Sequence, residues 1–104
     1  MPALSDYTNV FATALQVLRD KGYRVWFDAR AGNYCAEKDG WDFMSRSPCG
    51  LLGVVAIYEH VKPTQFREYW WRSYLAPDHR QLTRDSPDYI PVYARDKKST
   101  ETND

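Results

Sequence analysis

Apolar side chains recur three and four positions apart in the first twenty residues, which is the spacing of one helix face. They are Tyr7, Val10, Phe11, Ala14, Leu15 and Leu18. Ser5 is a suitable N-cap, and the Lys21-Gly22 pair combines a cation with a glycine, as at many helix ends. The pattern predicts an amphipathic helix over residues 6–20.

The apolar spacing then changes to every second residue, which is typical of strands. Within residues 23–28, Tyr23, Val25 and Phe27 share one face. A Gly32-Asn33 turn precedes a second run at 33–38, and an Asp39-Gly40 hairpin signal precedes a third at 41–44. These runs predict a three-stranded antiparallel meander.

Ser47-Pro48 repeats the chemistry of a helix start, because a capping hydroxyl is followed by a proline whose missing N–H costs nothing there. Residues 49–58 are apolar on every side, and we expect Gly50 and Gly53 to form a flat strip that another element approaches. The segment predicts a buried helix. The alternative is a buried strand over 51–58, because that segment holds three β-branched residues. The residues that we expect in the core are Leu51, Leu52, Val55 and Tyr58.

Pro63-Thr64 interrupts the chain, and Thr64 is a suitable cap for a further helix over about 65–74. After a polar stretch at 78–88, residues 89–93 predict a short edge strand or surface strap, since Pro91 lacks a backbone donor. Residues 94–104 are mostly polar and predict a disordered tail whose deletion leaves stability nearly unchanged. The predicted fold class is α+β, a single domain over 1–93 in the order α-β-β-β-α-α.

Length and composition agree with one small globular domain. The chain has 104 residues, 43% of them hydrophobic, and its formal net charge is zero. There is no basic start followed by an apolar run and no apolar stretch of about 20 residues, so we expect a cytoplasmic protein without a membrane partner. Cys35 and Cys49 are too few for a disulfide framework, which favours two reduced thiols over the alternative of a single bridge.

Aromatic side chains are concentrated in residues 66–74, where five of nine positions are Phe, Tyr or Trp. On a helix, Trp70 and Tyr74 share the apolar face, whereas Trp71 lies away from it beside Arg67 and Arg72. A surface rich in Trp and Arg is typical of binding hot spots, and Arg80 follows in the next loop. The alternative is that Trp71 packs against the loop beyond residue 78.

Three acidic residues, Glu37, Asp39 and Asp42, gather around the predicted hairpin turn. Their spacing does not match a calcium loop, so no metal site is predicted. Residues 28–42 hold four acids and two basic residues, which favours an acidic patch for a basic partner.

The sequence contains no phosphate-binding glycine loop, nucleophile elbow or metal-ligand spacing around its two histidines, His60 and His79. We therefore expect no cofactor and no catalytic residue. The favoured function is a non-enzymatic protein-binding module, such as an inhibitor, immunity-type or adaptor protein, with homodimer formation as a possibility.

Two other functions stay open. A single-stranded nucleic-acid-binding protein would use the Arg and aromatic residues of 62–84, where basic residues outnumber acidic ones. A small enzyme would use His60 or His79.

Overall fold

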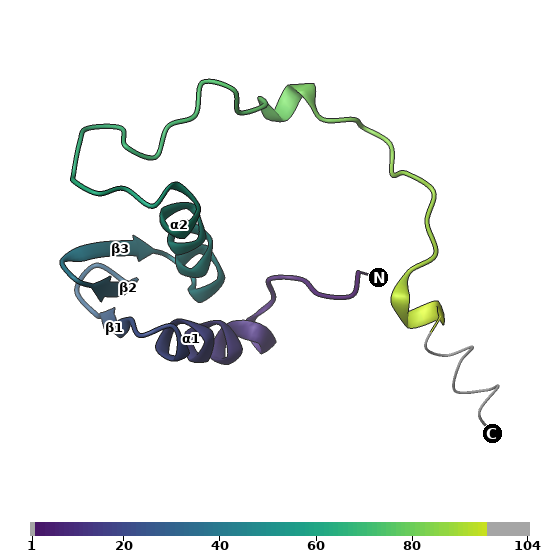
Figure 1. Cartoon of the computed structure of the whole chain (residues 1–104). Coiled ribbons are helices and arrows are strands. Elements are labelled where there is room, and N and C mark those ends of the chain that lie inside the picture. The colour runs from purple at the N-terminus through teal and green to yellow at the C-terminus, as the bar shows by residue number, and fades with distance from the viewer. Residues whose placement is uncertain (1, 96–104) are drawn as a thin grey trace. The chain divides into compact units, whose positions relative to one another are not determined.

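The computed structural model describes residues 2–95. The chain divides into two units, Asp6–Arg72 and Met1–Ser5 with Ser73–Asp104. The described strands and the helices α1, Phe11–Asp20, and α2, Pro48–Val61, which are labelled in Figure 1, belong to Asp6–Arg72. The α+β class and the three-stranded antiparallel sheet are therefore confirmed, whereas a single domain over 1–93 stays a prediction.

The first predicted helix is present but begins later than expected. A 3-10 turn at Thr8–Val10 leads into α1, Phe11–Asp20, which buries Ala14 and Leu18. Ser5 does not cap this helix, because the extended Tyr7 separates its hydroxyl from the first free N–H groups. The predicted stop is confirmed: Gly22 has a φ of 95°, which suits glycine, and its N–H donates to the Arg19 carbonyl at 2.9 Å.

The sheet is the predicted meander, with strands β1 Arg24–Asp28, β2 Asn33–Lys38 and β3 Trp41–Ser45 in the order β1-β2-β3. Both pairings are antiparallel. Asp39 and Gly40 have φ values of 53° and 86°, so the two-residue turn has the left-handed backbone that its sequence favours. The hairpin prediction from Asp39-Gly40 is confirmed.

The apolar segment after β3 forms a helix and not a strand. This helix, α2, runs Pro48–Val61, and the Ser47 hydroxyl accepts a hydrogen bond from the Gly50 N–H at 2.9 Å. Lys62 follows in the left-handed conformation and ends it. The proline after the cap fixes the start, and tertiary packing outweighs the lower helix propensity of the β-branched residues.

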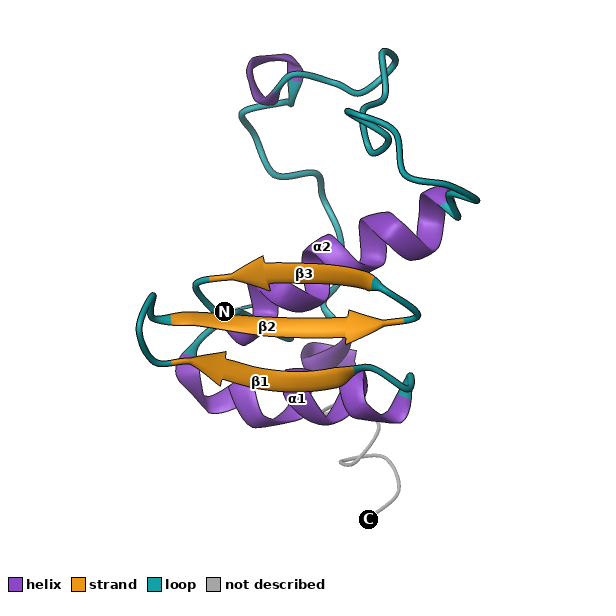
Figure 2. Cartoon of the chain, turned by 90° about the vertical axis from the view of Figure 1, so that its left-hand side faces the viewer, coloured by secondary structure: helices purple, strands orange, loops and turns teal. Residues whose placement is uncertain are grey.

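Both helices lie against the same face of the sheet, as Figure 2 shows. The core between them consists of Leu18, Tyr23, Ala36, Leu51 and Val55. Leu51 and Val55 are fully enclosed, as predicted, whereas Leu52 and Tyr58 are only half-buried.

The flat strip predicted from two glycines is only half right. Gly50 lies against Ser45, where strand β3 turns into α2, and a Cβ atom at Gly50 would stand 3.3 Å from the Ser45 Cβ. Gly53 faces open space instead. Only Gly50 therefore permits a close approach.

The other face of the sheet carries no helix of the Asp6–Arg72 unit. Across its centre, Trp26 pairs with Cys35 and Cys35 with Met44. The Cys35 side chain is buried, while Trp26 and Met44 are 47% and 62% exposed.

The helix predicted over 65–74 is absent, and this prediction is wrong. The chain makes irregular turns there, and Tyr69 takes a left-handed φ of 60° that breaks any helix. A short helix needs a buried face to be stable, but Tyr69 is 51% exposed and Tyr74 is 91% exposed. Aromatic side chains have low helix propensity, so nothing compensates.

The predicted strand or strap over 89–93 is not a strand either. The N–H groups of Ala94 and Arg95 donate to the Pro91 carbonyl at 3.1 and 3.2 Å, which makes a helical turn. Proline suits the first turn of a helix because its φ is already fixed there. Apart from Ala94 and Arg95, the predicted tail 94–104 lies outside the described residues.

Candidate functional site

Four aromatic side chains meet where β3 begins and α2 ends: Trp41, Tyr58, Phe66 and Trp70. We call this group the aromatic cluster. The Trp41 ring centroid lies 5.2 Å from that of Tyr58, 5.5 Å from that of Trp70 and 6.4 Å from that of Phe66. Trp70 also stands edge-on to Tyr58 at 6.1 Å. Such edge-to-face pairs are favourable beyond the area that they bury.

The local sequence explains why the aromatic cluster forms. Trp41 follows the Asp39-Gly40 turn directly, and strand alternation places it with Phe43 on the face that the helices cover. Tyr58 lies in the C-terminal part of α2, with its ring 5.2 Å from that of Phe43. After α2, Lys62 and Pro63 end the helical path, and the following segment brings Phe66 and Trp70 back to Trp41.

A surface pocket of about 440 Å³ lies beside the aromatic cluster. We call it the hairpin pocket. Asp39, Trp41 and Asp42 border it from the hairpin, and Phe66 and Trp70 border it from the segment after α2. The structure thus brings Trp70 together with Asp39 and Asp42, three residues that the sequence proposed for two separate patches.

The charges at the hairpin are distributed unevenly. Glu37 is engaged: its carboxylate accepts from the Gly40 N–H at 2.9 Å and lies 2.6 Å from the Arg24 guanidinium. The hydrogen bond from Gly40, together with Arg24, lowers the pKa of Glu37. The Asp39 and Asp42 carboxylates, by contrast, make no hydrogen bond or ion pair with any residue in 2–95.

The cation nearest in sequence does not neutralise Asp39 and Asp42. The Lys38 ammonium donates to the Lys21 carbonyl at 2.9 Å and lies 5.3 Å from the centre of the Tyr23 ring. Lys38 is therefore engaged at Lys21, directly after the C-terminal end of α1. The turn between β2 and β3 consequently presents negative charge, as the sequence predicted.

Tyr69, Trp71 and Arg72 form a second, smaller group. The Arg72 guanidinium lies 4.2 Å from the centre of the Tyr69 ring and 5.5 Å from that of Trp71. Both rings are about half exposed. Trp71 and Arg72 therefore lie together at the surface as expected, although on a turn and not on a helix.

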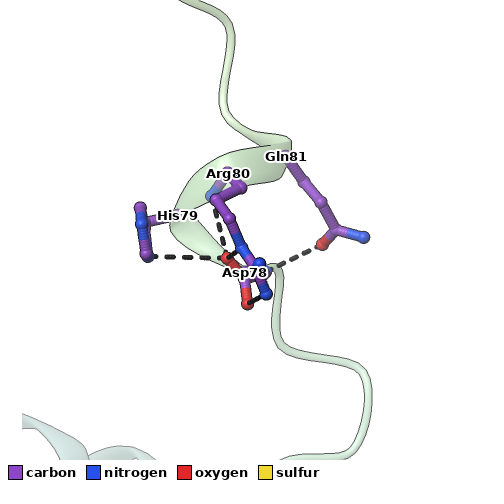
Figure 3. Close-up of polar contacts among 4 residues, drawn as sticks. All are labelled: Asp78, His79, Arg80 and Gln81. Carbon is purple, nitrogen blue, oxygen red and sulfur yellow. Dashed lines mark hydrogen bonds and ion pairs between the residues drawn. The ribbon is translucent and has the colours of Figure 1, made fainter.

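The remaining predicted binding residues are scattered. Arg67 is exposed on the segment between the pocket residues, while Tyr74 and Arg80 belong to the other unit. In that unit, Figure 3 shows Asp78 at the centre of a local hydrogen-bond group. Its carboxylate accepts from the Arg80 N–H at 2.9 Å and from the Arg80 side chain at 3.0 Å.

The Asp78 group caps the 3-10 helix His79–Gln81. The hydrogen bonds from Arg80 lower the pKa of Asp78 and raise that of Arg80. The His79 ring stands 3.5 Å from the Asp78 carboxylate, and its side chain is 85% exposed. Arg80 is thus occupied by Asp78, which weakens its case as a free binding cation. His60 is exposed in the last turn of α2.

A second pocket of about 380 Å³ lies beside Tyr23, Tyr58 and Glu59. Part of its polar lining is paired: the Glu59 carboxylate accepts from Lys21 at 2.8 Å and from the Tyr23 hydroxyl at 3.0 Å. Lys38, Asp39 and Lys62 also line this pocket. Lys21 is the main cause of a lowered Glu59 pKa, and burial raises the pKa of Tyr23. These contacts join α2 to the segment between α1 and β1, so Glu59 and Tyr23 have a structural role.

The described residues contain no group of three or more His, Cys, Asp or Glu side chains that could hold a metal ion. Cys35 and Cys49 are both free thiols, so the alternative of a bridge between them is not realised. Within residues 2–95 no helix has the length and apolar character needed to cross a membrane.

Comparisons with protein-family models, curated proteins and solved structures give no match to this chain.

Sequence reasoning missed three members of the aromatic cluster as site residues: Trp41, Tyr58 and Phe66. One signal for Trp41 was available, because it follows the Asp39-Gly40 turn and alternates with Phe43. Its meeting with Tyr58 and Phe66 depends on how α2 lies on the sheet. That arrangement has no local sequence signal.

Proposed function

We propose that the chain is a non-enzymatic protein-binding module that recognises a basic segment of a partner at the hairpin pocket. One observation carries the proposal: three aromatic rings adjoin Asp39 and Asp42, whose carboxylates have no charged partner within residues 2–95. Aromatic side chains supply contact area at protein interfaces, and exposed acids supply complementarity to a basic partner. An inhibitor, an immunity-type protein or an adaptor would act through such a surface.

We further propose a cytoplasmic location. The two free thiols of Cys35 and Cys49 fit a reducing compartment, where structural disulfides are rare.

Phe66 offers a sharp test of the proposed binding surface. Its side chain borders the pocket but is 77% exposed, so Phe66→Ala removes pocket surface and costs little stability. The matched control is Tyr74→Ala, which removes another exposed ring from a residue of the other unit.

The probes are pooled Lys/Arg-rich peptides and the same peptides with every basic residue replaced by Glu, measured by isothermal titration calorimetry. We expect basic peptides to bind the parent chain and the Tyr74→Ala variant alike, and Phe66→Ala to weaken binding by about tenfold, as a moderate interface residue does. Equal binding of acidic and basic peptides, or no effect of Phe66→Ala, would refute this function.

A second candidate function is single-stranded nucleic-acid binding. The observation that favours it is the group Tyr69, Trp71 and Arg72, where two half-exposed rings and a guanidinium are adjacent. Titration with a single-stranded oligonucleotide at rising salt tests it. Affinity that falls steeply with salt and is lost in Trp71→Ala supports this function, and no binding at low salt refutes it.

A further inference from the structure

We propose that the hairpin pocket holds one lysine or arginine side chain of the partner. The cationic head lies beside Asp39 and Asp42, and the aliphatic stem lies against Trp41, Phe66 and Trp70. This inference rests on the proposed function and adds the chemical identity of the group that enters the pocket.

The first argument is the aromatic wall. The Trp41 and Trp70 rings stand 5.5 Å apart at an angle of 76°, so the edge of one meets the face of the other. The Phe66 ring is 77% exposed beside them. A Lys or Arg cation is attracted to an aromatic face within about 6 Å, and Trp is the strongest such partner. The methylene groups of the same side chain cover apolar surface while the head stays in water.

The second argument is the sign of the charge. Arg24 engages Glu37, and Lys38 is engaged by the Lys21 carbonyl. Lys62 borders a second pocket together with Asp39, and Arg67 lies between Phe66 and Trp70, but neither makes an ion pair with the two aspartates. Asp39 and Asp42 make no ion pair with any residue that the structure describes. Asp39 and Asp42 both border the pocket, so an anionic group there would be repelled by two acidic residues, whereas a cation would be attracted to them. The two acidic residues thus favour a cationic ligand over a phosphate or a carboxylate.

The third argument is size. A pocket of about 440 Å³ lies near the lower end of the usual range of roughly 300–1,000 Å³ for ligand pockets. It has room for one long side chain but not for a helix. A single anchoring side chain, with the rest of the peptide on the surrounding surface, fits these dimensions.

Three small probes separate charge from shape: the N-acetyl methylamides of lysine, arginine and norleucine. Norleucine keeps the stem of lysine but lacks the ammonium group. Binding to the full chain is followed through the indole N–H signals of Trp41 and Trp70 by nuclear magnetic resonance. We expect saturable shifts with the lysine and arginine probes, and at least about tenfold weaker binding of the norleucine probe.

Two variants and a control test whether Asp39 and Asp42 attract the cationic probe. Asp39→Asn keeps the turn, since Asn tolerates positive φ and Asn-Gly is itself a favoured hairpin pair. Asp42→Asn is isosteric at an exposed position. Each is expected to weaken lysine-probe binding about threefold, in the range of an exposed ion pair. Glu68→Gln makes the same charge change outside the pocket lining and is expected to leave binding unchanged.

The outcomes distinguish this inference from the proposed function. If basic peptides bind in a Phe66-dependent way but the lysine and norleucine probes behave alike, the single-cation pocket is wrong and the binding surface stands. If Asp39→Asn and Asp42→Asn act no more strongly than Glu68→Gln, the pocket is equally refuted. If neither peptides nor probes bind, both proposals fall.

Discussion

The enclosed side chain of Leu51 gives the most direct test of how α2 sits on the sheet. Leu51 has no exposed surface and packs in the core with Leu18, Tyr23, Ala36 and Val55. Leu51→Ala removes three carbon groups. At about 0.8 kcal/mol for each buried group, the transfer loss alone is roughly 2.4 kcal/mol. The cavity that remains raises the expected loss of unfolding free energy to about 3–4 kcal/mol.

Leu52→Ala is the matched control, because the same carbons are removed one residue along the same helix. From the sequence alone, Leu52 was expected in the core, with a loss of roughly 2–5 kcal/mol on truncation. In the structure its side chain is half-buried, so no closed cavity forms and we expect a loss of about 1 kcal/mol. The difference between the two variants is more reliable than either value.

The assay is urea denaturation followed by far-ultraviolet circular dichroism, analysed at a common m-value. If Leu51→Ala has no native baseline, Val55→Ala removes two carbons from an equally enclosed site and should cost about 2 kcal/mol. Equal losses in Leu51→Ala and Leu52→Ala, or a larger loss in Leu52→Ala, would mean that α2 is rotated relative to the sheet. The core assignment would then be wrong.

Three further predictions concern other parts of the Asp6–Arg72 unit. Gly50→Ala should lower the free energy of unfolding by about 1 kcal/mol, because the new Cβ meets Ser45. Gly53→Ala should raise it by about 0.5–1 kcal/mol, because alanine has the higher helix propensity and the site is open. Thermal melts in which both variants shift in the same direction would contradict this. Folding lowers the pKa of Glu59, so the stabilisation from its carboxylate is complete above the unfolded pKa of about 4.5 and is lost as pH falls through the folded pKa. Glu59→Gln should therefore make the free energy of unfolding depend less on pH below about 4.5. An unchanged slope in that acid range would contradict this. Trp70→Ala should lower the free energy of unfolding by about 2 kcal/mol, because it removes contacts to Trp41 and Tyr58. Trp71→Ala should lower it by under about 0.5 kcal/mol, because Trp71 is half exposed. Denaturant titrations that give the reverse order would contradict the burial assignment.

The elements that sequence predicted correctly have their signals within a few residues. Asp39-Gly40 predicts a hairpin because both residues accept the left-handed backbone of the turn. Ser47-Pro48 predicts a helix start because the Ser47 hydroxyl caps the helix and the Pro48 ring already has a helical φ. The helix predicted over 65–74 failed for the opposite reason. Its spacing of aromatic residues resembled a helix face, but no surface covers Tyr69 or Tyr74 in the structure. Spacing indicates a helix only where tertiary packing stabilises it.

The candidate site was predicted only in part, for a related reason. The sequence identified Trp70 and the two aspartates as separate features, because they are about thirty residues apart in the chain. Their common pocket depends on the turn at Pro63 and on the position of Trp41 on β3. Neither follows from composition or from periodicity, so the two patches could be joined only by the three-dimensional arrangement.

The order of the strands has a consequence for the rate of folding. Each strand pairs with its neighbour in the sequence, and the two connections span only residues 29–32 and 39–40. Loop closures this short cost little entropy, and folds dominated by local pairings reach the native state in roughly milliseconds or less. The contact between α1 and α2 instead joins segments on either side of the whole sheet. We therefore expect the two hairpins to close first, and the docking of α2 onto α1 to be the slow event that completes the core.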